Sequence, residues 1–207
     1  MMLFPVLLGA ATLLYSALCT AVAVTVNTTA TELKAQGYTI DPLTIIGPVG
    51  PDGENITLTG TVQEIHSQLL EINSSYNVSV DVDSFTLDVA TKHEKRCPDK
   101  ILCGLTNYTP ANPRPILEGA VYLEGFKGVL CHVEAGPKRC VRFSCSYNSA
   151  IWLCNDAPKE LNIWCPDIGY DYVRPILGKC ATTSINRFNG QRFNTDNFNV
   201  LVIGDKC

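Results

Sequence analysis

The stretch CVRFSCSYNSAIWLC, residues 140–154, predicts a β-hairpin. Apolar and polar side chains alternate in its first half, so Val141 and Phe143 share one face of a strand. A turn is expected at residues 147–149, because Asn and Ser side chains hydrogen-bond the local backbone readily. The second half, residues 150–154, then returns as a continuous apolar strand.

The elements around this hairpin predict a small α+β domain. A short strand over residues 120–123, ended by Gly125, is expected before it. Residues 166–179 predict a helix from their apolar spacing, and an internal glycine and proline predict a kink. Residues 191–193 and 198–203 predict two more strands. This order predicts a disulfide-rich antiparallel sheet with a helix packed on one face.

Cysteine is distributed very unevenly along the chain. Of ten cysteines, nine follow the basic pair Lys95-Arg96, and none lies between residue 20 and this pair. An odd number leaves one thiol unpaired or joined to a second molecule. A bridge between Cys140 and Cys145 would strain a strand, and the sequence leaves the other pairings open. The nine cysteines are Cys97, Cys103, Cys131, Cys140, Cys145, Cys154, Cys165, Cys180 and Cys207.

The border at Lys95 and Arg96 predicts a precursor. Residues 24–96 would be an acidic pro-segment, or propeptide, and a dibasic processing protease would release residues 97–207 as the cysteine-rich mature domain. The pro-segment carries ten acidic and four basic residues, whereas the rest carries ten acidic and twelve basic. Three alternatives stay open. The segment assists folding of the downstream domain, is a disordered spacer, or is never cut and forms one domain with it.

The pro-segment is expected to be largely helical or irregular. A capping box at residues 61–64 begins a helix that ends near residues 73–75. Residues 47–53 predict a loop, and residues 78–89 alternate like a pair of strands. The apolar stripe of the helix consists of Val62, Ile65, Leu69 and Ile72.

The first 23 residues predict a secretory signal peptide. An apolar run over residues 3–18 precedes the small-residue pattern Ala21-Val22-Ala23, and Cys19 belongs to this leader. We therefore expect a secreted, extracellular glycoprotein with oxidised cysteines and no membrane span after signal removal. Its glycosylation sequons are Asn27, Asn55, Asn73, Asn77 and Asn107.

Three strings in the second half carry a resemblance: VYLEGFKG at 121–128, CVRFSCSYNSAIWLCND at 140–156, and GQRFNTDNFNV at 190–200, with a terminal DKC. Together they resemble small cysteine-rich secreted proteins of plant-associated ascomycete fungi, which are treated as candidate effectors. Element order and cysteine density are also similar to virally encoded killer toxins of smut fungi and to secreted necrosis-inducing factors. Those proteins are disulfide-rich α/β sandwiches.

The resemblance also has implications for the cysteines. The pattern of the group matches Cys97, Cys140, Cys145, Cys154, Cys180 and Cys207. It implies that Cys103, Cys131 and Cys165 are additions, and that one of them is the odd thiol.

The sequence offers little catalytic chemistry. His132, Glu134 and Arg142 could serve as the acid, base and phosphate-binding residues of a ribonuclease. Glu118 and Glu124 could form the carboxylate pair of a glycosidase. The spacing of these residues along the chain matches no motif of either enzyme class. The downstream half holds one histidine, which predicts no metal site. Its small positive charge predicts no nucleic-acid partner. We expect no enzymatic activity and no cofactor.

Aromatic side chains point instead to binding. Trp152 is expected in the core, whereas Trp164 is the candidate for an exposed binding surface, with Tyr170 and Tyr172 nearby in the sequence. The sequence favours a secreted fungal-type protein that binds a host or competitor protein or a cell-surface target, as a candidate virulence effector. The alternatives are an antimicrobial or killer-type toxin and a secreted ribonuclease-like hydrolase.

Overall fold

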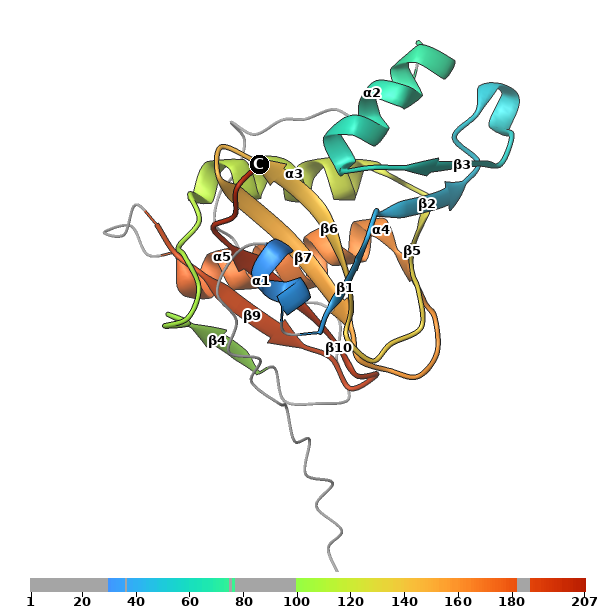
Figure 1. Cartoon of the computed structure of the whole chain (residues 1–207). Coiled ribbons are helices and arrows are strands. Elements are labelled where there is room, and N and C mark those ends of the chain that lie inside the picture. Colours follow the sequence, from blue (N-terminus) through green and yellow to red (C-terminus); the bar gives the residue numbers. More distant parts are fainter. Residues whose placement is uncertain (1–29, 36, 75, 77–99, 182–186) are drawn as a thin grey trace, which may run out of the picture.

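The computed structural model describes residues 30–35, 37–74, 76, 100–181 and 187–207, which form an α+β fold with two sheets (Figure 1). The larger sheet contains, in spatial order, β1 (Thr39–Asp41), β6 (Arg139–Ser146), β7 (Ser149–Asn155), β10 (Phe198–Ile203), β9 (Gly190–Phe193) and β4 (Ile101–Cys103). The smaller sheet contains β3 (Ile56–Thr59), β2 (Thr44–Gly47), β5 (Leu130–Val133) and β8 (Leu161–Trp164). Only β1 and β6 pair in parallel among the described strands.

The predicted hairpin is confirmed as β6 and β7. Its tight turn consists of Tyr147 and Asn148, whose φ angles of 47° and 55° are both in the left-handed region. This backbone suits the right-handed twist of paired strands. Every residue of β7 is buried, because this strand lies in the middle of the sheet and both of its faces are covered.

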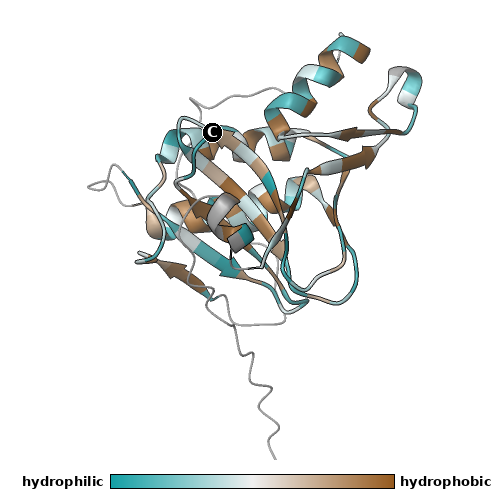
Figure 2. Ribbon diagram, viewed as in Figure 1, coloured by the Kyte–Doolittle hydropathy of each residue, from teal (hydrophilic) through white to brown (hydrophobic). Residues whose placement is uncertain are grey.

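The two faces of the larger sheet belong to two apolar clusters. Ile151 and Leu153 of β7 pack into the main core together with the helices, whereas Trp152 packs into a second cluster with Leu33 of α1 (Ala30–Ala35). Figure 1 shows α1 and α3 on opposite sides of this sheet, and Figure 2 shows that its central strands are largely apolar. Successive side chains of β7 therefore point alternately into the main core and into the second cluster.

The strand expected at residues 120–123 is wrong, because these residues belong to helix α3 (Pro113–Gly125). The side chain of Asn112 caps the helix by accepting from the amide of Arg114 at 3.1 Å. A Cβ added at Gly119 would lie 2.6 Å from the Oγ of Ser144, so α3 packs directly on β6. The capping residue Asn112 lies eight residues before the β-prone string, and packing of the whole helix overrides the local preference of that string.

The helix predicted at residues 166–179 is confirmed as one helical run of three pieces. These are α4 (Cys165–Asp167), a π-helical turn labelled η2 (Ile168–Val173), and α5 (Arg174–Cys180). The expected irregularity takes the form of the π turn. A Cβ added at Gly169 would lie 2.8 Å from the carbonyl oxygen of Ala120, so the absence of a side chain lets η2 approach α3.

Residues before Lys95 contribute to both sheets, which corrects the expectation of a largely helical or irregular segment. The helix predicted from the capping box is confirmed as α2 (Val62–Ile72), and hydrogen bonds from Thr61 hold the pKa of Glu64 below its ordinary value. The strands β1, β2 and β3 were not predicted. The loop at residues 47–53 contains a short 3-10 turn, η1 (Pro51–Gly53). The strand pair expected at residues 78–89 lies outside the described residues.

These early elements share the main core with the cysteine-rich part. Leu43, Ile45 and Leu69 are fully buried in the cluster that also contains Leu123 and Phe126. In the described part of the chain, residues 39–72 are thus folded against the downstream residues. The cutting site Lys95 and Arg96 lies outside the described residues.

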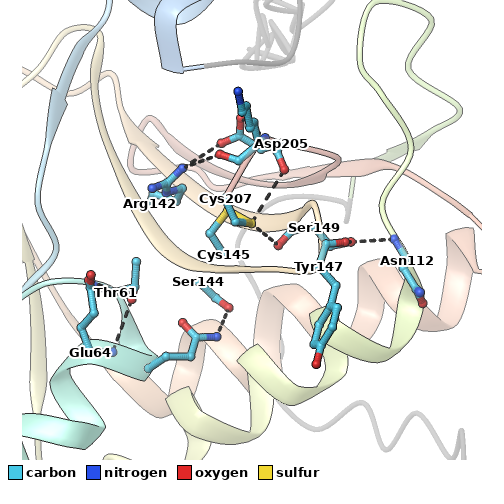
Figure 3. Close-up of a disulfide and its surroundings, with 12 residues drawn as sticks. Thr61, Glu64, Asn112, Arg142, Ser144, Cys145, Tyr147, Ser149, Asp205 and Cys207 are labelled. Atoms are coloured by element: carbon cyan, nitrogen blue, oxygen red, sulfur yellow. Dashed lines mark hydrogen bonds and ion pairs between the residues drawn. A yellow bond between two sulfur atoms is a disulfide. The ribbon is translucent and has the colours of Figure 1, made fainter.

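Four disulfides brace the downstream half. Cys103–Cys180 joins β4 to α5, Cys131–Cys165 joins β5 to α4, Cys140–Cys154 crosses the hairpin, and Cys145–Cys207 ties the last residue to β6 (Figure 3). The expectation that Cys103, Cys131 or Cys165 is the odd thiol is wrong, because all three are bonded. The ninth downstream cysteine is Cys97, which lies outside the described residues.

A partly buried ion pair, in which the carboxylate is the buried partner, joins α3 to the helical run. The guanidinium of Arg174 binds the carboxylate of Glu124 through two hydrogen bonds, one of them 2.7 Å between Nη2 and Oε2. These bonds raise the pKa of Arg174 above its ordinary value. The Arg174 guanidinium also lies over the ring of Tyr170, 5.8 Å from its centroid. The pair fixes η2 and α5 against α3.

Digestion of the purified protein without reductant is expected to give four cross-linked peptide pairs, with Cys97 in none of them. Mass spectrometry before and after reduction reads this directly. Cys131–Cys165 and Cys140–Cys154 are buried and therefore resist thiol exchange, whereas Cys103 and Cys207 are exposed, so free thiols are blocked before digestion. A cross-link between Cys97 and any of the other eight would contradict the expected set, which is Cys103–Cys180, Cys131–Cys165, Cys140–Cys154 and Cys145–Cys207.

Replacing Arg174 by Ala is expected to lower the free energy of unfolding by about 3 kcal/mol, because it leaves the Glu124 carboxylate buried without its guanidinium. Urea denaturation measures this change. The matched control is Arg114→Ala, which removes an exposed pair with Glu118 from α3 and should cost less than about 0.5 kcal/mol. Equal losses in the two variants would show that the buried pair has no special role.

Candidate functional site

One face of the smaller sheet carries the candidate site, and we call it the outer face. Side chains alternate along each strand, so residues next to a buried position point to the opposite side. The inner positions include Ile45 and Cys131, which are fully buried in the main core. The outer face consists of Thr44, Ile46, Thr57, Thr59, Leu130, His132, Asn162 and Trp164.

An apolar row crosses three strands of the outer face. Leu130 lies opposite Ile46 on one side and opposite Trp164 on the other. Trp164 is 50% exposed and Ile46 is 40% exposed. Both are among the few large apolar side chains that the described residues expose. The row therefore places two exposed apolar side chains and the partly exposed Leu130 side by side on one face of a regular sheet.

The disulfide Cys131–Cys165 lies directly behind this row. Cys131 stands between Leu130 and His132 in β5, and Cys165 follows Trp164. Both sulfurs face the core, so the neighbouring side chains must point outward. The amide of Cys165 also donates to the carbonyl oxygen of Val129 at 3.0 Å. The backbone that carries Trp164 is thus held by the neighbouring disulfide and by the hydrogen bonds that pair β8 with β5.

A polar row runs beside the apolar one. His132 lies opposite Thr44 and opposite Asn162. Its Nδ1 lies 2.8 Å from the Oδ1 of Asn162, and its Nε2 lies 3.6 Å from the Oε1 of Glu134. An amide oxygen only accepts, so this contact places a hydrogen on Nδ1. The row offers hydrogen-bonding groups beside the apolar surface.

The residues considered for a ribonuclease are only partly brought together. His132 and Glu134 meet on the outer face. Arg142 instead binds Asp205 through Nη1 and Oδ2 at 3.3 Å (Figure 3). Its guanidinium also lies over the ring of Trp152. Burial raises the pKa of Asp205, and the bond from Arg142 opposes that shift. Arg142 therefore anchors the C-terminal residues rather than serving a site with His132.

The two carboxylates considered for glycoside cleavage are each paired with arginine. Glu118 binds Arg114 within α3, and Glu124 binds Arg174 of α5. Each carboxylate is thus neutralised by its own guanidinium, and the two do not act on a shared cleft.

The remaining predicted residues have different environments. Trp152 is buried in the second cluster, which confirms its expected place, and Tyr172 is buried as well. Tyr170 is half exposed beside Arg174. Among the sequons, Asn55 and Asn107 are exposed, and Asn73 is half-buried at the end of α2. Asn27 and Asn77 lie outside the described residues.

The described residues contain neither a candidate metal site nor a candidate membrane-spanning helix. No group of three or more His, Cys, Asp or Glu side chains there is placed to hold a metal ion. Within the same residues, no helix has the length and apolar character needed to cross a membrane.

Comparison with known proteins gives no match. No protein-family model matches the chain. No curated protein matches it, and no solved structure matches it. The functional conclusion therefore rests on the outer face, the disulfide framework and the sequence resemblance.

Proposed function

We propose that this protein is a secreted, fungal-type, small cysteine-rich protein that acts by binding a protein or cell-surface target of a host, as a candidate virulence effector. The observation that carries the proposal is Trp164, half exposed on a sheet face that a disulfide holds from behind. The resemblance of residues 119–207 to fungal candidate effectors supports the same class.

The outer face has the composition of a protein-binding surface. Interfaces typically combine an apolar centre with a polar rim, and tryptophan is enriched among the residues that contribute most to affinity. Trp164, Leu130 and Ile46 supply the apolar row. His132 and Asn162 supply polar groups beside it. A partner that covers Trp164 would remove its exposed apolar surface from water.

Rigidity supports binding in a second way. Ordering a flexible loop or side chain costs free energy on association, and a preorganised surface avoids much of that cost. Trp164 ends β8 and precedes the bonded Cys165, so its backbone is fixed before any partner arrives. Disulfides also suit a protein that has to persist outside the cell.

A killer-type or antimicrobial toxin is the alternative binding role. The α+β fold with four disulfides is compatible with the sandwich that the toxins share. Such a toxin would use the same outer face on a competing cell. The responding organism separates the two roles, because an effector acts on plant tissue and a toxin acts on fungal cultures.

Trp164→Ala is expected to weaken the response of plant tissue to the purified protein about 30-fold, because truncating a central interface tryptophan removes its contact with the target. Ion leakage over a concentration series measures the response. The matched control is Tyr147→Ala, since Tyr147 is 81% exposed on the turn of the β6–β7 hairpin, away from the outer face.

Several outcomes of this assay argue against the proposal. Wild-type activity on fungal cultures alone would favour the toxin. Equal responses to both variants would remove the outer face from the binding mechanism. Absence of any response in plant tissue and in fungal cultures would count against both binding roles. Circular dichroism of each variant confirms that it is folded.

A ribonuclease-like activity is the second candidate function, because His132 and Glu134 lie together on an open face. An imidazole and a carboxylate at this separation can share acid and base roles. The wild-type protein is expected to leave RNA intact, since Arg142 is bound to Asp205 and supplies no phosphate contact there. Cleavage by the wild type that His132→Ala abolishes would instead establish the enzyme.

A further inference from the structure

Strand pairing joins the early part of the chain to the cysteine-rich part at two places. Strand β1 extends the larger sheet by pairing in parallel with β6, from Thr39 opposite Arg139 to Asp41 opposite Val141. Strand β2 lies between β3 and β5 in the smaller sheet. Removing residues before Lys95 would therefore leave two strand edges, on β5 and on β6, without their present partners.

The contact between the two parts is also an apolar core. Leu43, Ile45, Val62, Ile65 and Leu69 come from the early part, and each is fully buried. They pack in the same cluster as the apolar residues of α3 and β5. Figure 1 shows α2, β2 and β3 lying together beside α3, and Figure 2 shows the alternating polar and apolar residues of α2. Separation would expose all five side chains to water.

Specific polar contacts fix the register of this interface. The Nε of Arg139 lies 2.9 Å from the Oδ2 of Asp41 across the β1–β6 pair. The Nε2 of Gln63 donates to the Oγ of Ser144 at 2.7 Å, beside the start of α2 (Figure 3). The rings of His66 and Tyr122 lie 5.1 Å apart between α2 and α3. These contacts are made by the larger sheet and by helices α2 and α3.

Nothing covalent other than the main chain can hold the two parts together. Residues 24–96 contain no cysteine, and all four disulfides lie within residues 103–207. A cut at Lys95-Arg96 would therefore leave only the non-covalent interface. That interface buries a continuous core, which is typical of obligate rather than transient association.

We propose that cutting at Lys95-Arg96 yields a two-chain protein, in which the fragment before the cut remains bound as a non-covalent subunit. The early segment thus occupies the β5 and β6 edges and the core side of the cysteine-rich part, and it leaves the outer face open. This inference rests on the proposed processing and on the proposed role of the outer face. The pro-segment would then persist as a permanent subunit and would not be discarded after the cut.

The outer face explains why retention of this fragment matters. Strands β5 and β8 supply Leu130, His132 and Trp164, whereas β2 supplies Thr44 and Ile46. Without β2, the apolar row loses Ile46 and the β5 edge is left unpaired. The complete face exists only when both chains are present.

The experiment treats the purified full-length secreted chain with a dibasic-specific protease and compares two separations. Native mass spectrometry is expected to give one species with the summed mass of both fragments. A denaturing gel without reductant is expected to give two bands, since no disulfide joins them. A cysteine-rich fragment that appears alone in the native measurement overturns the proposal, and so does a chain that stays uncut.

Two neighbouring residues of β2 provide matched variants. Ile45 is fully buried toward the core, whereas Ile46 points outward. After the cut, Ile45→Ala is expected to weaken fragment association on the order of 100-fold, and Ile46→Ala by less than about twofold. Dissociation is measured by dilution followed by native mass spectrometry. Equal effects of the two variants overturn the proposal.

The assembly measurement needs no target, so it separates this inference from the proposed function. A stable two-chain protein without any tissue response leaves the assembly intact and contradicts the binding role. A tissue response from the cysteine-rich fragment alone overturns the claim that both chains are required.

Discussion

Pairing of β2 with β5 is the interaction on which the structure depends most. Three residue pairs, from Thr44 opposite His132 to Ile46 opposite Leu130, join strands that are more than eighty residues apart. This pairing completes the smaller sheet and brings Leu43 and Ile45 into the main core. It also builds the outer face from both parts of the chain. Core, sheet and candidate site therefore form together.

The sequence predicted those elements whose signals are local. The β6–β7 hairpin, α2 and β10 each have a period, a cap or a turn within a few residues, and these appear in the structure. The strands β1, β2, β5 and β8 are three or four residues long and have distant partners. Such strands gain stability from pairing rather than from propensity, so their own residues carry little signal. The string at 120–123 was mispredicted for the opposite reason, since its residues carry a local strand signal but belong to a helix that packs on β6 at Gly119.

The candidate site shows the same division. Trp164 was identified from its residue type, and it is half exposed on an edge strand. Its neighbours Ile46 and Leu130 were not identified, because only the register across three strands places them beside it. His132 and Glu134 are two residues apart on one strand and its end, so alternation alone puts them on one side. Placing Arg142 with them required a tertiary contact, and Asp205 takes it instead.

The distribution of disulfides separates two kinds of stabilisation. Downstream, bridges restrict the unfolded chain, and each typically contributes about 2–4 kcal/mol whether or not another segment is bound. Upstream, residues 39–72 are held to the downstream half only by apolar packing, by strand pairing and by a few polar contacts. Covalent bracing therefore maintains the surface that receives the early segment, including the Cys131–Cys165 bond behind β5. A receiving surface that keeps its shape reduces the entropic cost of holding a partner. In the proposed two-chain assembly, the cysteine-free segment stays associated after the cut because the disulfides limit how far the half that binds it can rearrange.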